Sequence, residues 1–500
     1  MDTSPAQRSP AGARQPPASQ EPFGRARPWV TASCALGLGA GFLLAAILSV
    51  TQALNVPLGL WWLALVQAHG HVQVFGWAGL LVLGVALHFL PRLRGAPLAY
   101  PRIAPWLLAL LGGGLILRAL GQPLLALAAP GAMFWQVVLA GAGLAEFAGA
   151  CGVVGLLCLT LRRGPSLARR PALQAFLPYA LAGLLSFWLA LALNAIEGVS
   201  MLLAGRALFS GRMDAAITQL GLFGFLVPIA LGMAARVLPL YVGLRPLPAR
   251  VLWPVFSGYV AGLLLSLLVP WMDANTALAG YLQGSAALLM GSALLAFPIF
   301  QGLLLPRRWM RLMIPAVQTQ HISLPARPYP VAQGNDRAAF GPYDWLIRSA
   351  FGWLALAALT FCIDGAAQLG GGFGPIDDDV TRHAATVGFV ALLIFGVGQR
   401  MLPGFAGSRL LSPHLVTATL WLGSAAALLR VVPVLVGPWV GGSGLPGWIA
   451  LLLRGAFGFS GPLALMAVLC FTINLWNILR PAPRAGQRAS KRQDAAVDAP

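Results

Sequence analysis

The segment Gln67–Gly95, QAHGHVQVFGWAGLLVLGVALHFLPRLRG, decides the fold of this chain because its pattern occurs three times. Each copy has the pattern of one membrane helix, with a polar residue near its start and a Leu-Pro stop at its end. The copies align without a gap at His71, Phe75-Gly76-Trp77, Gly84, His88 and Leu90-Pro91; at Gln219, Phe223-Gly224-Phe225, Gly232, Arg236 and Leu238-Pro239; and at His383, Val387-Gly388-Phe389, Gly396, Arg400 and Leu402-Pro403.

The second and third copies begin 148 and 164 residues after the copy before them. A repeat of this length is too long for a solenoid, whose units have about 20–50 residues. It fits a bundle of several helices that has been repeated. The alternative is chance recurrence of Gly and Leu-Pro in an Ala/Leu/Gly-rich chain, but ungapped agreement across three copies favours duplication.

The composition is that of a polytopic membrane protein. Of the 500 residues, 58% are hydrophobic and 9% charged, whereas a soluble domain has about 25% charged residues. The net charge of +19 comes from Arg in short loops, so it does not indicate nucleic-acid binding. The five Cys form no CxxC or CxxCH motif, which leaves no zinc ribbon or c-type haem attachment site.

The apolar runs predict an all-α fold of about twelve transmembrane helices, since about 20 residues cross a bilayer core. The expected spans are roughly 29–52, 61–90, 104–120, 133–161, 174–200, 214–238, 251–270, 276–304, 345–363, 380–402, 415–436 and 447–479. The three copies fall on spans 2, 6 and 10, each the second helix of a four-helix unit. The units are 29–165, 170–311 and 343–480, and they predict pseudo-threefold symmetry about the membrane normal.

The segments outside this single transmembrane domain, 29–480, are polar. We predict disordered cytoplasmic tails at 1–28 and 481–500 and a cytoplasmic loop at 312–342. Arg residues concentrate in alternate loops, which places both termini in the cytoplasm by the positive-inside rule. The expected location is therefore a membrane whose cytoplasmic side carries the Arg-rich loops.

His71 and His383 are the strongest site candidates, because they occupy the same repeat position. Each lies 20 residues before its Leu-Pro proline, about 30 Å along a helix, so both are expected at one depth toward the outer side. Two neutral imidazoles at one depth can hold a haem iron from both sides, with Gly76 and Gly388 providing room. The alternative is that both are helix-packing histidines.

Other polar residues in the spans are weaker candidates. His69 lies two residues from His71 and points about 200° away from it, so the two do not readily bind one metal. His88 has the pattern of an interfacial residue, with a metal ligand as the alternative. Arg382 suits a haem propionate. Glu146, Asn194 and Glu197 can form a proton path or pair with Arg206.

This architecture, with histidines on spans 2 and 10, resembles subunit I of the heme-copper oxidases. The resemblance implies a low-spin haem between those spans, held by His71 (or His69) and His383. That superfamily also has a copper site formed by histidines on spans 6 and 7, and a second histidine near the first on span 10. Spans 6 and 7 contain no His here, and Thr381 and Ala385 flank His383. Oxygen or nitric oxide reduction at a haem-copper centre is therefore not expected, and the interpretation leans away from an enzyme.

The motifs themselves look more like the NnrS family of bacterial inner-membrane proteins. The matching stretches are His69-Gly70-His71 through Phe75-Gly76, His383-Ala384 through Val387-Gly388, and the stop Met401-Leu402-Pro403. The glutamate that usually follows the first histidine pair in that family is absent. The resemblance implies haem b, copper as a second candidate cofactor, and a role in the response to nitric oxide.

The leading hypothesis is therefore a haem-binding membrane protein that acts in nitrosative stress, by binding nitric oxide or by passing electrons to a redox partner. Its metal-ligand candidates are His69, His71, His88 and His383. The competing hypothesis is a transporter or channel whose path is lined by Glu146, Glu197 and Arg236. The sequence leaves the oligomeric state open.

Overall fold

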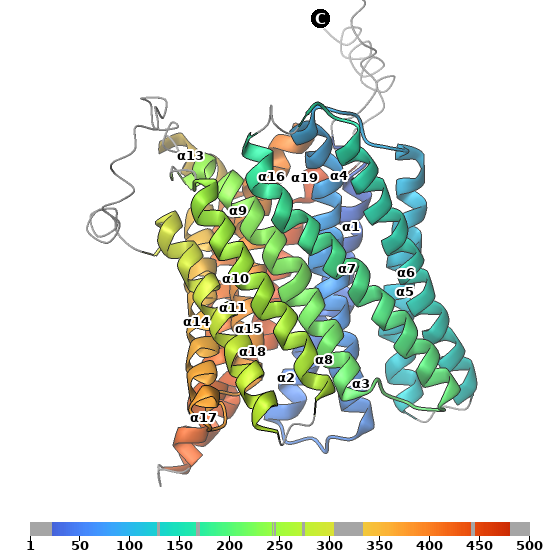
Figure 1. Ribbon diagram of the computed structural model, residues 1–500, viewed down its shortest axis with the longest axis vertical. Coiled ribbons are helices and arrows are strands. Elements are labelled where there is room, and N and C mark those ends of the chain that lie inside the picture. The colour runs from blue at the N-terminus through green and yellow to red at the C-terminus, as the bar shows by residue number, and fades with distance from the viewer. Residues whose placement is uncertain are drawn as a thin grey trace, which may run out of the picture.

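The computed structural model describes residues 23–127, 131–166, 171–242, 244, 247–272, 276–304, 334–441 and 446–480. Within these residues the structure is all-helical and contains no strand (Figure 1). Twelve helices are long and apolar enough to cross a membrane. The predicted number of spans is therefore confirmed, and the polar segments 1–22 and 481–500 lie outside the described residues.

Most spans of the bundle are single, unbroken helices. These are α5 (Ala104–Ala126, preceded by η3, Pro101–Ile103), α6 (Ala132–Arg162), α7 (Pro171–Leu203), α10 (Ala249–Leu268, followed by η6, Val269–Trp271), α11 (Ala277–Gln301), α14 (Tyr343–Leu369), α17 (Pro413–Gly441) and α18 (Gly447–Asn474). Two short helices, α13 (Gly334–Phe340) and α19 (Trp476–Leu479), lie outside the spans.

Four spans are instead interrupted by a π-helical segment. They are α1–η1–α2 (Arg27–Leu36, Gly37–Phe42, Leu43–Ala53), α3–η2–α4 (Leu60–His71, Val72–Gly79, Leu80–Arg94), α8–η5–α9 (Gly211–Gln219, Leu220–Leu226, Val227–Val242) and α15–η8–α16 (Asp378–His383, Ala384–Ala391, Leu392–Ala406). π-Helical turns are rare and occur frequently at functional sites. In spans 2, 6 and 10 the π segment begins at the residue after His71, Gln219 and His383, so the three sequence copies share this irregularity at the same position.

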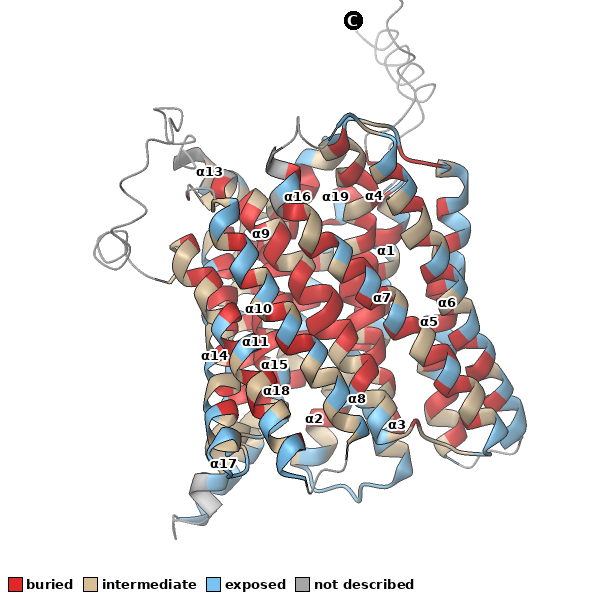
Figure 2. Cartoon of the chain, in the orientation of Figure 1, coloured by how far each residue is buried: buried red, intermediate tan, exposed pale blue. Residues whose placement is uncertain are grey.

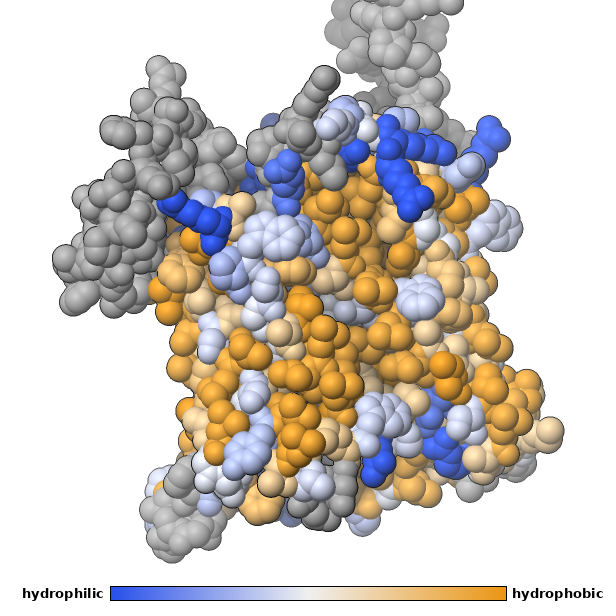
Figure 3. Space-filling view, in the orientation of Figure 1, coloured by the Kyte–Doolittle hydropathy of each residue, from blue (hydrophilic) through white to orange (hydrophobic). Residues whose placement is uncertain are grey.

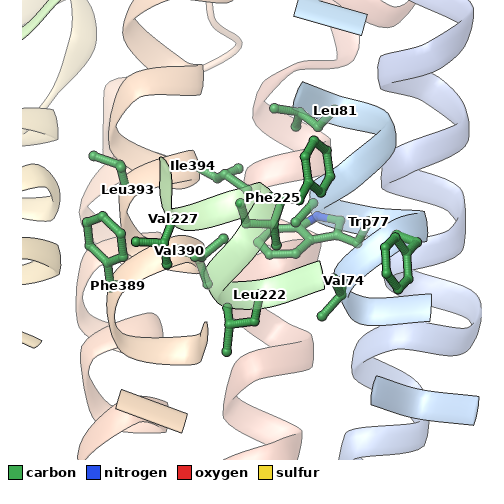
Figure 4. Close-up of a cluster of buried hydrophobic side chains, with 14 of the residues drawn as sticks. Val74, Trp77, Leu81, Leu222, Phe225, Val227, Phe389, Val390, Leu393 and Ile394 are labelled. Carbon is green, nitrogen blue, oxygen red and sulfur yellow. The ribbon is translucent and has the colours of Figure 1, made fainter. Parts of the chain in front are cut away.

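Spans 2, 6 and 10 form the centre of the bundle. In their most hydropathic windows 72%, 78% and 72% of the residues are buried, compared with 50% or less in every other span (Figure 2). The segment η5 contacts both η2 and η8. At this level Trp77, Phe225 and Val390 from the three spans pack together in an apolar cluster (Figure 4).

The other nine spans surround this centre in chain order. Neighbouring contacts run α5–α6–α7 from span 2 to span 6, and α10–α11–α14 from span 6 to span 10. Helices α17 and α18 follow span 10, and α18 packs against α2 of span 1. Small residues allow the close approach: a Cβ at Gly291 would lie 2.7 Å from the Ala358 carbonyl oxygen, and one at Gly365 would lie 2.7 Å from that of Gly284.

The two ends of the described chain meet at one end of the bundle, where Arg27 Nε donates to the Ile478 carbonyl oxygen at 2.9 Å. Residues 23–28, assigned from sequence to the N-terminal tail, belong to the fold, and Phe23 is fully buried. Helix α13 occupies the described part of the predicted loop 312–342. We call this end, which also carries Arg92 and Arg162, the basic end. Hydrophilic residues gather at both ends, and the surface between them is mainly apolar (Figure 3).

Candidate functional site

His69 lies near the end of α3 and is partly buried. Its Nδ1 is 2.9 Å from the carbonyl oxygen of Gly41, in η1 of the adjacent span 1. The glycine matters here because span 2 approaches closely: a Cβ on Gly41 would lie 2.5 Å from the amide oxygen of Gln73. This contact fixes the tautomer of the ring, with the proton on Nδ1 and the lone pair on Nε2.

His383 is the last residue of α15 and has a similar environment. Its Nδ1 lies 2.9 Å from the Asp379 carbonyl oxygen and 3.0 Å from Asp379 Oδ1, one helical turn earlier. Asp379 is in turn paired with Arg430 of α17, at 2.7 Å between Oδ2 and Nη2. Arg430 also lies over the Phe457 ring, 4.4 Å from its centroid. The carboxylate therefore orients the imidazole and is itself held by a cation.

Helix α18 connects the surroundings of His69 and His383, because it packs against η1, which carries Gly41, and against α17, which carries Arg430. The charges of Asp379 and Arg430 are near enough to act on His69. Among the described residues, neither Nε2 has a hydrogen-bond partner. Two histidines whose Nδ1 atoms are bound and whose Nε2 atoms are available have the arrangement that metal-ligating histidines adopt, in which the second nitrogen donates to a carbonyl or carboxylate.

His71 has a different environment, although it is only two residues from His69. Its Nε2 lies 2.6 Å from Oε2 of Glu146 in α6. Asn194 Nδ2 donates to the same oxygen at 3.3 Å, and Arg118 Nη1 donates to the Asn194 side-chain oxygen. None of these four side chains is more than 5% exposed. His71 is thus part of a buried polar cluster formed by α3, α5, α6 and α7, which we call the Glu146 cluster.

Several polar atoms of the Glu146 cluster have no partner among the described residues. They are His71 Nδ1, Glu146 Oε1, and Arg118 Nε and Nη2. Burying such a group without a hydrogen-bond partner costs roughly 1–3 kcal/mol of folding free energy for each group. The unpartnered atoms include both donors and acceptors. Because a carboxylate and a guanidinium lie together, the cluster suits neither an isolated cation nor an isolated anion, and internal water matches both kinds of group.

A chain of polar contacts connects the Glu146 cluster to the end of the bundle opposite the basic end. Gln122 Nε2 donates to Gln67 Oε1 at 2.6 Å, and Gln67 also bonds the backbone of Phe209. The Phe209 ring lies 4.1 Å from the Arg118 guanidinium carbon. The predicted pairing of Glu197 with Arg206 is confirmed, at 2.9 Å between Oε1 and Nη1.

Toward the basic end, the centre of the bundle contains only apolar side chains around its main cavity. This cavity of about 150 Å³ is lined by α4, α6, α7, η5, α9, η8 and α16, and its lining includes Leu81, Met233 and Leu402. Arg236 does not line it. Of the residues predicted for a transport path, none lines this cavity.

Glycines 76 and 388 do not border open space. A Cβ on Gly388 would lie 2.6 Å from Cγ of Trp353, and one on Gly76 would lie 3.4 Å from Leu36 Cδ1. Both glycines lie against neighbouring side chains, and Gly388 lets Trp353 approach span 10 closely. Gly70, beside His69, is the position where an added Cβ meets nothing within 4 Å.

The remaining predicted site residues are spread over both ends. His88 is 6% exposed and packs between the rings of Phe23 and Phe405, with centroids 5.4 and 4.6 Å away. Arg382 is exposed at the end where His383 lies. Arg400 pairs with Asp336 of α13 at 3.3 Å.

Two further histidines, and Gln219 in the middle copy of the repeat, lie apart from the residues described above. His414 is exposed at the start of α17. His321 lies outside the described residues. Gln219, which replaces the histidine in span 6, donates to Ser266 Oγ at 3.0 Å.

Sequence reasoning missed three charged residues of these sites. Asp379 stands four residues before His383, which is the spacing of side chains on one helix face, so this contact was readable. Arg118 and Arg430 each stand alone in an apolar run, and an ionisable residue inside a span is a functional candidate by default. Which histidine each one accompanies depends on helix rotation, which the spacing alone does not give.

No family model matches this chain, and no curated protein matches it. Within the described residues, no group of three or more His, Cys, Asp or Glu side chains converges as a metal site. A protein-only metal centre generally needs three or four ligands. Haem iron already has four porphyrin nitrogens and needs only axial ligands from the protein. A site of two histidines fits haem in this respect.

Proposed function

We propose that this chain is a haem-binding membrane protein whose axial ligands are His69 and His383. The observation that carries the proposal is the matched state of the two rings: each Nδ1 is bound to an oxygen and each Nε2 is available. His71 is replaced as the span 2 ligand because its Nε2 is already bound to Glu146. When bound, a haem held by two histidines supplies one-electron redox chemistry, and it would bind a diatomic gas only after one of the histidines has left the iron.

The chain's own residues fit such a group beyond the two ligands. The carbonyl of Gly41 and the carboxylate of Asp379 set ring orientation and raise the basicity of the coordinating nitrogens. Arg430, and the exposed Arg382 beside His383, provide positive charge for propionates. At Gly70, the residue after His69, an added Cβ would meet nothing within 4 Å.

The proposed architecture is that of heme-copper oxidase subunit I, with three four-helix units arranged by pseudo-threefold symmetry. The supporting observations are the central position of spans 2, 6 and 10 and the π segment at the same position in each. The basic end would face the cytoplasm of a bacterial cell, because Arg-rich short loops are retained there. Both termini would then be cytoplasmic.

The cellular role proposed is protection against nitric oxide, by haem-based gas binding or by electron transfer. It rests on the resemblance of the His69–Gly76 and His383–Gly388 motifs to the NnrS family. Cells lacking this chain should grow more slowly in the presence of a nitric oxide donor. The wild-type chain should restore growth, and a His69→Ala/His383→Ala chain should not. Equal restoration by both would contradict a haem-dependent role.

The direct test is an optical spectrum of the purified full chain, oxidised and then reduced. We expect a low-spin haem b spectrum that is lost in His69→Ala and in His383→Ala and kept in His88→Ala. A purified wild-type chain without haem absorbance would refute the proposal. If the haem spectrum is lost in His71→Ala and kept in His69→Ala, the span 2 ligand is His71 instead.

A transport function is the second candidate, and the buried Glu146 cluster is the observation that favours it. Ionisable groups inside membrane spans frequently mark ion or proton pathways. The apolar lining of the central cavity argues against a complete path. Ion flux into vesicles containing the purified chain, abolished by Glu146→Gln, would support transport over haem chemistry.

A further inference from the structure

The apolar cavity at the basic end has the shape and position of a lipid site. It follows span 2 from Leu81, at the middle of the bundle, to Leu93, which is about 18 Å along a helix. Its other walls come from α9 and α16 and from the ends of α6 and α7 nearest the basic end, including Leu161 and Phe176. Helices α6 and α7 diverge toward this end (Figure 1).

The chemistry of the lining indicates a hydrocarbon chain. Every lining residue is apolar or glycine, and the wall contains no polar side chain. The ring of a quinone carries two carbonyl oxygens that need donors when buried, and this lining offers no side-chain donor. Hydrophobic residues form the surface below the hydrophilic upper rim (Figure 3), which is the position of acyl chains below their headgroups.

The rim of the cavity is strongly basic. Exposed Arg92 adjoins the lining residue Leu93 in sequence, and exposed Arg162 and Arg163 follow the lining residue Leu161. The segments 91–95 and 160–166 contain no Asp or Glu. Arg94 fastens the two segments together by donating to the carbonyl oxygens of Leu161, Gly164 and Pro165. Three exposed arginines therefore stand next to lining residues of the cavity, or one residue further along the chain, at the basic end of the bundle.

We propose that this cavity binds one acyl chain of an anionic phospholipid, with the phosphate held by Arg92, Arg162 and Arg163. The apolar wall accommodates the chain, and the basic rim selects an anionic headgroup over a zwitterionic one. The site lies at the basic end, whereas the two histidine sites lie toward the other end. It depends on the chain spanning a membrane and not on haem binding, so the two proposals can fail separately.

Native mass spectrometry of the full chain in mild detergent tests this proposal. The chain is mixed with equal amounts of phosphatidylglycerol, phosphatidylethanolamine and ubiquinone. We expect a phosphatidylglycerol adduct, and we expect Arg162→Gln/Arg163→Gln to weaken that adduct by about tenfold. Arg162→Lys/Arg163→Lys should keep most of the binding. The matched control is Arg409→Gln/Arg480→Gln, which removes two exposed arginines elsewhere and should change nothing.

A second variant tests the apolar wall. Ala230→Phe fills the cavity and should weaken every lipid adduct while the protein stays monodisperse on gel filtration. If Ala230→Phe aggregates, the arginine variants decide the question. Equal adducts with phosphatidylethanolamine, a preferred ubiquinone adduct, or unchanged binding in Arg162→Gln/Arg163→Gln would each overturn the proposal.

Discussion

His69 and His71 stand two residues apart on one helix, and their surroundings are opposite in kind. His69 is partly exposed, bonds a backbone carbonyl through Nδ1, and shares its environment with His383. His71 is buried and bonds Glu146 through Nε2. The comparison shows that identical residues on one span can have separate functions when the helix turns them toward different neighbours.

The two histidines at the equivalent repeat position, His71 and His383, also differ in their partners. His71 Nε2 bonds Glu146 of α6, and His383 Nδ1 lies 3.5 Å from Nη2 of Arg430 of α17. In the units predicted from sequence, α6 is the fourth span of the first unit and α17 is the third span of the third unit. Equivalent positions in the sequence repeat therefore do not have equivalent partners in the bundle.

The largest expected effect is on haem content, when His69 and His71 are each replaced by alanine. His69→Ala should remove the bound haem completely, because one axial ligand is lost, while His71→Ala should retain haem with a weakened Glu146 cluster. Haem content per protein, from a pyridine haemochrome assay of both variants, measures this. Equal haem loss in both variants would erase the distinction between the two environments.

The next effect should fall on the stability of the His71 side. Glu146→Ala removes the buried partner of His71 Nε2 and the carboxylate that Arg118 reaches through Asn194. Removing one partner of a buried ionic pair costs about 3–5 kcal/mol. Thermal unfolding in detergent measures it. The control is Asp344→Ala, whose partner Arg337 is 61% exposed and whose loss should cost less than about 1 kcal/mol. Similar shifts for both variants would contradict a buried ionic cluster.

A smaller effect is expected from the carboxylate on the His383 side. Asp379→Asn keeps the volume but weakens orientation of the ring and the pairing with Arg430, and groups that orient metal ligands typically contribute about 10–100-fold in affinity. Haem titration of the haem-free protein measures the change. Asp378→Asn, at the exposed neighbouring position, is the control. The assignment of Asp379 fails if the two variants bind haem alike.

The smallest effect should come from two glycines, one on each side. Gly114→Ala places a Cβ 2.6 Å from Glu146 Cγ and 2.7 Å from the Ala142 carbonyl oxygen, which should cost about 1–3 kcal/mol. Gly70→Ala meets nothing within 4 Å and should be neutral or slightly stabilising. The unfolding midpoints of the two variants give the comparison, and a larger loss for Gly70→Ala would show that the space beside His69 is misassigned.

Much of the fold was predictable because apolar length and repeat spacing determine it. The twelve spans follow from hydropathy, and the copy of the Phe-Gly and Leu-Pro pattern singled out spans 2, 6 and 10, which prove to be the central helices. The divergence of His69 and His71 also followed from helix geometry. Sequence could not tell which of them faces span 10, because that depends on how span 2 is rotated in the bundle.

The supporting charges were less predictable for a related reason. Asp379 is local to His383, so its contact is encoded in one turn of helix. Arg430 and Arg118 reach their partners from other helices, and nothing in the apolar runs around them specifies a rotation. The packing role of Gly388 was hidden because the bulky partner, Trp353, comes from α14.

The π segment η2 gives span 2 a property that an unbroken α-helix lacks. It begins directly after His71 and accommodates extra backbone within the helix. It therefore determines how α3, which carries both histidines, is rotated about the helix axis relative to α4. Deleting one residue within Val72–Gly79 would restore regular phase and rotate one half against the other by about 100°. The number of residues in η2 therefore helps to determine which neighbours His69 and His71 face. Deleting one residue there would change those neighbours without substituting either histidine.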